Sequence, residues 1–309
     1  MRAVVYRSVG APAVIEVAEI ERPEPGMFEI RIKVDAAALN PADVAAWSGL
    51  FPAPVEGSHF GLGWDVAGTV DAVGPGAAWE LGTPVIAIVQ GATGVLRAQA
   101  EYAIVPSNAI AVAPAGIDAT HAATIPLNGL TAAQSVELLG LATGQSVFIT
   151  GAAGAVGGYA VQLAKRRGLT VIASDRADDD EFVTTVLGAD AFVPSSEDPT
   201  AAVHKLYPNG VDAVLDTTTL GSRIIGAVTD RGTFVTTRVD ALPQPERGIR
   251  VRLTQVAPDA AMLTTLSDLA AAGALALRVA RTYPLDEAAR AHARQAEGGL
   301  RGRLVLTTS

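Results

Sequence analysis

The residues best suited to chemistry form one glycine-rich segment, Gly151-Ala152-Ala153-Gly154-Ala155-Val156-Gly157-Gly158. It follows a short apolar run and opens a segment with helical spacing, which is the context of a dinucleotide-binding loop. Gly151 and Gly154 would let the backbone turn tightly and approach a pyrophosphate, and Gly157 would let helix and strand pack closely. The helix N-terminus would offer N–H groups to the phosphates. Because the spacing departs from Gly-x-Gly-x-x-Gly, a glycine-rich turn without a ligand stays an alternative.

A second candidate group follows the next expected strand. Asp175 stands near the spacing of about 20 residues from the first glycine at which a ribose-binding acid is expected. A carboxylate there would bond the ribose hydroxyls of NAD and repel the 2′-phosphate of NADP. The guanidinium of Arg176 has the opposite preference, because it favours a phosphate. The two residues therefore leave the cofactor open, and a simple turn-capping role for Asp175 is the alternative without a ligand.

The segments that must position these residues alternate between helix and strand. Helical spacing covers 118–125, 131–141, 154–167, 178–187 and 200–206, and apolar runs predict strands at 146–150, 170–174, 191–193 and 211–215. Continuously apolar strands between helices are typical of a parallel sheet that is covered on both faces. Before them, period-two alternation at 14–20 and 28–34 with frequent Pro and Gly predicts a β-rich domain or barrel. Strand-like segments at 277–280 and 303–306 are expected to complete that first domain.

Composition narrows the class of protein. The chain has 309 residues, of which 49% are hydrophobic and 18% charged, so it can bury a large core. A net charge of −9 without a basic stripe argues against nucleic acid or an anionic membrane as a partner. With no cysteine, disulfides and thiolate metal sites are excluded. We find neither a signal-peptide pattern nor an apolar run of about 18 residues, and so expect a cytoplasmic protein without a membrane span.

Several further motifs occur in an order that is familiar. They are Asn40-Pro41-Ala42-Asp43, Ser48-Gly49-Leu50-Phe51, Gly63-Trp64-Asp65, Asn128-Gly129-Leu130-Thr131, the Gly151 to Gly158 loop, Val211-Asp212-Ala213-Val214-Leu215-Asp216 and Gly302-Arg303-Leu304-Val305. With them the chain resembles quinone oxidoreductases of the medium-chain dehydrogenase/reductase superfamily over nearly its whole length. The resemblance implies a GroES-like β-barrel catalytic domain at 1–121 with 278–309. It also implies a Rossmann domain with a doubly wound parallel sheet at 122–277, an active cleft between the two, and a homodimer.

The resemblance also implies a cofactor, which is NADPH in most members of the family, with NADH as the alternative. It further implies which residues contact that cofactor. Asn40 and Thr131 would lie beside the nicotinamide and are the candidate catalytic residues. The other expected cofactor contacts are Asn128, Gly151, Gly154, Ala155, Val156, Gly157, Ser174, Asp175, Arg176, Thr236 and Arg303. The expected substrate pocket is lined by Trp47, Phe51 and Trp64, although Trp47 and Phe51 are equally suited to a core.

Two departures from related proteins bear on the chemistry. Asn40 stands where zinc-dependent relatives have a cysteine, and Trp64-Asp65 stand where they have His-Glu, so we expect no zinc. Ala45 and Phe51 occupy positions where quinone oxidoreductases often have tyrosines, which leaves no phenol there to donate a proton. Solvent is then the expected proton source, with His59 as a weaker alternative.

The expected function is metal-free hydride transfer from NAD(P)H to a quinone or an α,β-unsaturated carbonyl. One alternative is an enoyl reductase-like tailoring enzyme of a biosynthetic pathway. Another, outside the enzymes, is a nicotinamide-cofactor-binding sensor or structural protein. The quinone or enone reductase and the tailoring enzyme would differ in the residues that line the substrate pocket, and the sequence leaves both open.

Overall fold

The computed structural model describes residues 1–91 and 94–308, which form two compact units. Unit 1 contains Met1–Leu127, Ala257–Gly273 and the chain from Leu277 onward, and unit 2 contains Asn128–Val256 with Ala274–Ala276. The C-terminal segment thus rejoins unit 1. These bounds differ from the expected ones mainly at Ala257–Gly273, which the sequence analysis had given to the second domain. No helix in the described ranges combines the length and apolarity needed to cross a membrane.

Unit 1 is built on antiparallel strands. They are β1 (Arg2–Tyr6), β2 (Ile15–Glu19), β3 (Glu29–Ala38), β4 (Phe60–Gly61), β5 (Asp65–Val73), β6 (Pro84–Ile88), β7 (Tyr102–Pro106), β8 (Ile110–Val112), β15 (Val279–Pro284) and β16 (Arg303–Thr307). A small sheet has the order β2-β1-β4, and a larger one the order β15-β16-β3-β5-β6-β8 with β7 also paired to β3. Frequent turns between short strands produce this arrangement, as the Pro and Gly spacing predicts.

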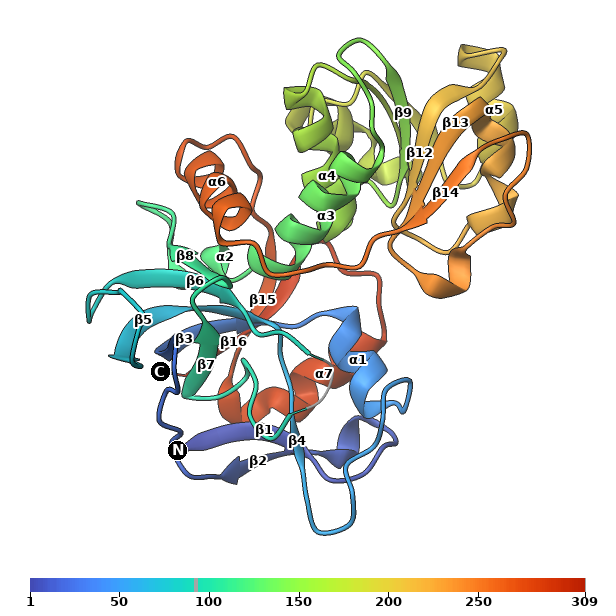
Figure 1. The fold of residues 1–309 in the computed structure, drawn as a ribbon. Helices are drawn as coiled ribbons and strands as arrows, with labels where there is room; N and C mark the ends of the chain where they lie inside the picture. Colours follow the sequence, from blue (N-terminus) through green and yellow to red (C-terminus); the bar gives the residue numbers. More distant parts are fainter. Residues whose placement is uncertain (92–93, 309) are drawn as a thin grey trace. The chain divides into compact units, whose positions relative to one another are not determined.

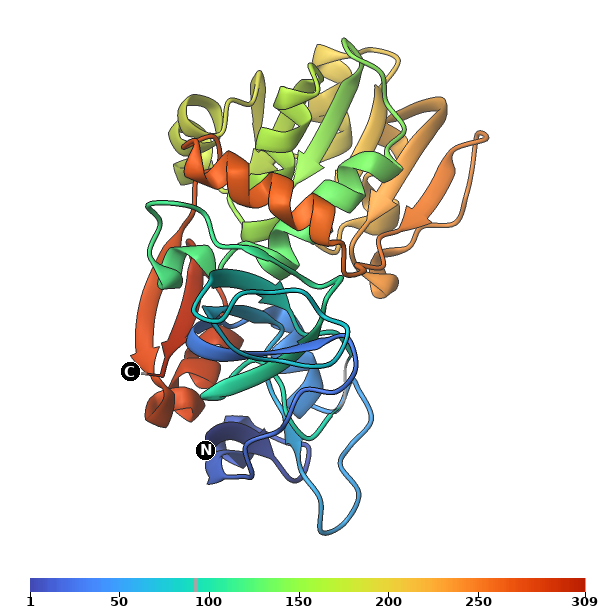
Figure 2. The ribbon, with the colours of Figure 1, turned by 60° about the vertical axis from the view of Figure 1, so that its left-hand side comes forward.

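The C-terminal strands lie beside the N-terminal half of unit 1, as Figure 2 shows in red and blue. β16 pairs antiparallel with β3, with Val305 opposite Ala38, and parallel with β15. The α-helices in the described part of this unit are α1 (Pro41–Trp47), α2 (Ala119–Ala122), α6 (Ala260–Ala271) and α7 (Ala288–Ala296). α6 packs on β8, where the Ser267 hydroxyl donates to the Val112 carbonyl at 2.7 Å. That contact explains why this segment belongs to unit 1.

Unit 2 is a parallel sheet with helices on both faces. Its strands are β9 (Ser146–Thr150), β10 (Thr170–Asp175), β11 (Ala191–Pro194), β12 (Val211–Asp216), β13 (Val228–Thr236) and β14 (Arg250–Leu253), in the order β11-β10-β9-β12-β13-β14. The helices α3 (Pro126–Leu138) and α4 (Ala155–Arg166) lie on one side of it and α5 (Pro199–Leu206) on the other (Figure 1). The strand order reverses between β9 and β12, and ligands of such sheets bind outside the carboxyl ends at that point.

Some expected elements differ from the observed ones. The expected helix at 178–187 is helical but irregular: a 3₁₀ helix at Ala177–Asp179 is followed by a π-helix at Phe182–Val186. The helices α1, α6 and α7 were not predicted. In α7 the buried face is formed by Ala288, Ala291, His292 and Gln295, so no large apolar side chain marks this helix in the sequence.

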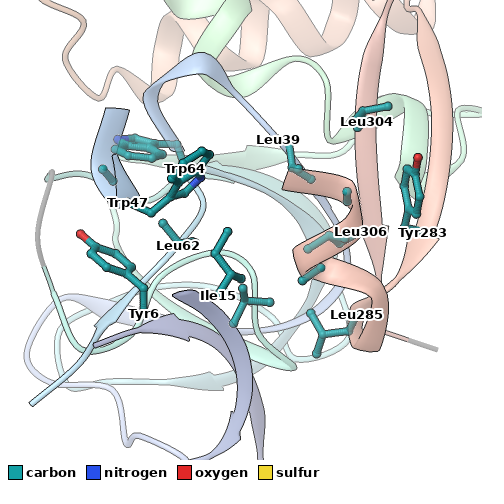
Figure 3. Close-up of a cluster of buried hydrophobic side chains, with 14 residues drawn as sticks. Tyr6, Ile15, Leu39, Trp47, Leu62, Trp64, Tyr283, Leu285, Leu304 and Leu306 are labelled. Atoms are coloured by element: carbon teal, nitrogen blue, oxygen red, sulfur yellow. The ribbon is translucent and has the colours of Figure 1, made fainter. Parts of the chain in front are cut away.

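The core of unit 1 beside α1 and α7 is aromatic and aliphatic (Figure 3). Its large members are Tyr6, Leu39, Trp47, Leu62, Trp64, Tyr283, Leu304 and Leu306. They come from β1, from α1 and the segment before it, from the segment after β4, and from β15 and β16. Through this cluster the C-terminal strands pack against the segments that contain Asn40 and Trp64.

The first prediction concerns Asp212, which joins two strands of unit 2. Its carboxylate accepts hydrogen bonds from the Ser146 N–H at 2.8 Å, the Ser146 hydroxyl at 2.7 Å and the Gln145 amide at 3.0 Å. Asp212→Ala should lower the free energy of unfolding by about 1–3 kcal/mol, because it leaves these donors without their acceptor. Urea unfolding followed by circular dichroism at neutral pH measures the difference.

The control is Asp230→Ala, which removes an exposed ion pair with Arg247 and should change the free energy by less than about 0.5 kcal/mol. Burial opposes the charge of Asp212, but its hydrogen bonds outweigh burial and lower its pKa. Its contribution should therefore be complete above the ordinary pKa near 3.9 and be lost as the pH falls below it. Equal unfolding midpoints for the two variants would contradict the assignment.

Candidate functional site

The carboxyl ends of four neighbouring strands bring polar side chains into one row in unit 2. Thr150 at the end of β9 is paired in register with Ser174 on β10 and with Asp216 on β12, and Asp216 with Thr236 on β13. All four residues are buried. Ser174 and Thr236 were predicted as cofactor contacts, and the strand register places them at the carboxyl edge of the sheet.

Asp216 organises this edge, and the sequence analysis gave it no role. Its carboxylate accepts from the Thr150 hydroxyl at 2.7 Å, the Thr218 N–H at 2.9 Å and the Gly221 N–H at 2.8 Å. The signal that could have found it is an acid directly after the buried run at 211–215. Asp216 therefore fixes the end of β9, from which the glycine-rich loop starts.

The loop itself has the geometry of a phosphate cradle. Gly151 has φ +64°, a conformation that side chains disfavour. A Cβ on Gly157 would lie 2.1 Å from the Gly151 carbonyl oxygen, so only glycine lets α4 start this close to the loop. Gly154 precedes α4 and supplies no side-chain cap. The N–H groups of the first turn, including those of Ala155 and Val156, lack partners within a helix and are suited to an anion.

Asp175 closes the other side of the loop. Its carboxylate accepts the Ala153 N–H at 2.9 Å and the Arg176 N–H at 2.8 Å, and the Ser174 carbonyl accepts the Ala152 N–H at 3.1 Å. The carboxylate is thus held against the loop by backbone donors, whereas the Arg176 side chain is exposed. Asp175 and Arg176 favour different cofactors, and the Asp175 carboxylate is the group that hydrogen bonds hold beside the loop.

The remaining expected contacts of unit 2 lie on α3 and at the end of β13. The Thr131 carbonyl accepts the Ser135 hydroxyl at 2.6 Å, and Asn128 on the same helix is buried. The Thr236 hydroxyl accepts the Arg238 N–H at 3.1 Å. The Arg238 guanidinium is paired with Asp240 through two hydrogen bonds of 2.7 and 3.0 Å.

In unit 1, Asn40 and Asp65 form a fully buried pair. The Asn40 Nδ2 donates to Asp65 Oδ2 at 2.5 Å and to the Ala38 carbonyl at 3.4 Å, which fixes the plane of its amide. The other oxygen of Asp65 accepts the Leu127 N–H at 2.6 Å, in the first turn of α3. Burial raises the pKa of Asp65 to about 7, opposed by these two donors and by the charge of Arg303. The Arg303 guanidinium also donates to the Leu39 carbonyl at 3.1 Å.

Asp43 is the second buried carboxyl group of this network. One oxygen accepts the Asn40 N–H and the other the Gly63 N–H, both at 2.7 Å. Burial raises the pKa of Asp43 to about 7, and the two N–H groups and the charge of Arg97 oppose that rise. Asp43 therefore holds together the two backbone segments on which Asn40 and Asp65 stand.

The residues at the implied metal positions do not fit zinc. An indole offers no lone pair for a metal, so Trp64 cannot be a ligand, and an amide oxygen is not among the usual zinc ligands. Both oxygens of Asp65 are occupied by Asn40 and the Leu127 N–H. In the described part of the chain no three His, Asp or Glu side chains gather to hold a metal ion.

The expected pocket residues all lie in or against the core of unit 1, where Trp47 and Trp64 are buried members of one cluster and Phe51 packs against it. Phe51 and Trp64 have ring centroids 6.4 Å apart and planes at 50°. The Trp47 indole N–H donates to Nδ1 of the fully buried His292 at 3.2 Å. Nε2 of His292 lies 2.8 Å from Oε1 of Gln99, so this histidine is a satisfied core residue.

Comparison with known proteins agrees with this architecture. Residues 26–115 match the family described as alcohol dehydrogenase GroES-like domain, and residues 187–306 the family described as zinc-binding dehydrogenase. A chloroplast envelope quinone oxidoreductase homolog of Arabidopsis thaliana is 32% identical over 225 residues, which are 70% of this chain and 67% of that protein. The chain spans about half to two thirds of the length of the curated relatives it matches.

Two solved structures extend the likeness to the whole fold. An NAD-dependent alcohol dehydrogenase is 30% identical with a TM-score of 0.88, and the match covers 100% of both chains. A mycobacterial protein solved in complex with NADPH is 27% identical with a TM-score of 0.83, covering 99% of this chain and 100% of the other. The predicted combination of a GroES-like domain with a Rossmann-type parallel sheet is confirmed. The chain belongs to the quinone oxidoreductase family of the medium-chain dehydrogenase/reductase superfamily.

Proposed function

We propose that this protein is a metal-independent, nicotinamide-dependent reductase of quinones or α,β-unsaturated carbonyls. The observation that carries the proposal is the loop before α4, where Gly151 and Gly157 keep side chains away from a helix N-terminus that has no side-chain cap. Such a helix end is built to receive an anion, and here it stands at the switch point of a parallel sheet. The donor set at Asn40, Trp64 and Asp65 supports chemistry without zinc.

In the proposed reaction, residues of unit 2 bind the cofactor and residues of unit 1 bind the substrate. In unit 2 the first-turn N–H groups of α4 would hold the pyrophosphate of a reduced nicotinamide dinucleotide, which when bound would supply the hydride. Asp175 and Ser174 are assigned to the adenosine ribose. In unit 1, Phe51 and Trp64 are assigned to the apolar ring of the substrate, and the buried network of Asp43 and Asp65 keeps the Asn40 amide in one orientation. A quinone that accepts a hydride becomes a hydroquinone anion, which takes its one further proton from solvent.

For the cofactor, the fixed position of Asp175 favours NADH over the NADPH that the resemblance implies. A carboxylate held against the loop by two backbone N–H groups offers acceptors to a ribose diol and repels a 2′-phosphate. The relatives include both an NAD-dependent protein and one solved with NADPH, so either preference occurs in this fold.

The second prediction tests the proposed reaction. Purified protein in chelator-treated buffer should oxidise reduced nicotinamide when a benzoquinone, an ortho-quinone or a small enone is added, because no step needs a metal. Absorbance of the reduced nicotinamide measures the rate. Activity that disappears on chelation and returns with Zn²⁺ would contradict metal independence. Cofactor binding without turnover of any acceptor would contradict a quinone or enone reductase and favour an enzyme of narrower specificity or a cofactor-binding protein without catalysis.

Two glycine variants make a matched pair for that assay. Gly157→Ala would place a Cβ 2.1 Å from the Gly151 carbonyl oxygen, and the shifted loop should weaken cofactor binding by at least about tenfold, or ~1.4 kcal/mol. Gly158→Ala meets its nearest atom, the Ala152 carbonyl oxygen, at 3.4 Å and should bind the cofactor as the parent does. Equal affinities for both variants would remove the loop from the proposed site.

The third prediction concerns the choice between the cofactors. The parent protein should prefer NADH, and Asp175→Ser should shift the ratio of kcat/KM values toward NADPH by at least about tenfold, because a like charge beside the 2′-phosphate is removed. Asp178→Ser, which changes an exposed acid after the same strand, should leave the ratio unchanged. If the parent protein already prefers NADPH, Arg176 rather than Asp175 selects between the two cofactors, and Arg176→Ala should then lower the preference for NADPH.

A further inference from the structure

Arg97 is an arginine whose place in unit 1 no motif predicts. Its side chain is almost completely buried, with 2% of the residue exposed. Nε donates to the Gly63 carbonyl at 3.0 Å and Nη2 to the Val89 carbonyl at 3.1 Å, while Nη1 donates to the Gly91 carbonyl. A single guanidinium thus joins the segment before β5 to the segment after β6.

The same guanidinium lies against the ring of Trp64, with its central carbon 4.1 Å from the ring centroid. A cation stacked on an indole away from water is attracted more strongly than one at an exposed site. The planar fork of arginine allows stacking and donation in the plane at once, which an ammonium group cannot do. The orientation of Trp64 is therefore set by Arg97.

The charge of Arg97 is retained at neutral pH. Burial lowers its pKa to about 10, and the nearby carboxyl group of Asp43 opposes that fall. Asp43 accepts the N–H of Gly63, whose carbonyl accepts from Arg97. The guanidinium is consequently coupled to the buried network that fixes Asn40.

We propose that Arg97 is a positioning residue of the reductase: it holds the Trp64 ring and the segment Val89–Gly91 in the arrangement that receives the substrate. The role in catalysis rests on the proposed function, whereas the effect on Trp64 does not. Loss of the guanidinium should misplace one wall of the substrate site and leave the cofactor loop of unit 2 intact.

The fourth prediction compares Arg97→Met and Arg97→Lys with the same changes at Arg31. Arg31 is the matched control, because it is also buried in unit 1, donates to the Pro23 carbonyl at 2.8 Å and lies 5.7 Å from the ring centroid of Tyr102. Steady-state kinetics with benzoquinone and NADH should show KM for the quinone raised about tenfold in Arg97→Met, with the dissociation constant of NADH unchanged. Arg97→Lys should fall between, and both Arg31 variants should keep the parent KM.

A merely structural role predicts a different result, because partial unfolding lowers the apparent kcat and leaves KM unchanged. Parent KM values in both Arg97 variants would overturn the proposal. If Arg97→Met does not fold, Arg97→Lys decides alone, since lysine keeps the charge but cannot stack and donate in one plane.

A second readout is independent of turnover. The emission of Trp64, taken as the difference between each protein and its Trp64→Phe counterpart, should change in the Arg97 variants and not in the Arg31 variants. Unchanged Trp64 emission in both Arg97 variants would overturn the proposal even if the enzyme were active. Changed emission in a protein that reduces neither a quinone nor an enone would refute the proposed function and keep Arg97 as the residue that orients Trp64.

Discussion

Two carboxyl groups, those of Asp43 and Asp65, lie in unit 1 without exposure to solvent, and every neighbouring segment is arranged to satisfy them. An unpartnered buried charge costs far more than one contact returns, so each oxygen needs a donor. The donors are the backbone of Asn40, Gly63 and Leu127 and the amide of Asn40. Within unit 1, the start of α1, the segment before β5 and the backbone at Leu127 are consequently fixed to one another by two side chains.

The parts of the site that the sequence predicts are those in which a short segment carries both the structure and the chemistry. The loop from Gly151 to Gly158 is one, because its glycines define the turn, the helix start and the phosphate contact within a single βα unit. The position of Asp175 beside it follows from the same unit. The alternation of apolar strands and helices likewise predicts the parallel sheet of unit 2 before its strand order is known.

The parts that could not be predicted depend on contacts between distant segments. For Trp47 the sequence leaves a pocket and a core role equally open, and its burial in the core depends on His292, which is 245 positions away and accepts its indole N–H. Nothing near Arg97 indicates that its guanidinium meets Trp64 and the carbonyls after β6. The segment Ala257–Gly273 belongs to unit 1 because α6 packs on β8, a pairing that local periodicity does not reveal.

The occupied oxygens of Asp65 also constrain how a protein of this fold could gain or lose a metal. Substituting cysteine for Asn40 and histidine for Trp64 would supply the residue types of a zinc site beside Asp65. The same substitutions would remove the Asn40 amide that donates to Asp65 and the indole ring against which the Arg97 guanidinium is stacked. Asp65 would still be bound to the Leu127 N–H, with one oxygen turned toward the helix. Conversion between the two kinds of site therefore requires coordinated replacement of ligands and of their supporting residues, so single substitutions along that route cross a less stable intermediate sequence. The loss of stability in that intermediate sequence opposes this conversion in natural evolution and in protein engineering alike.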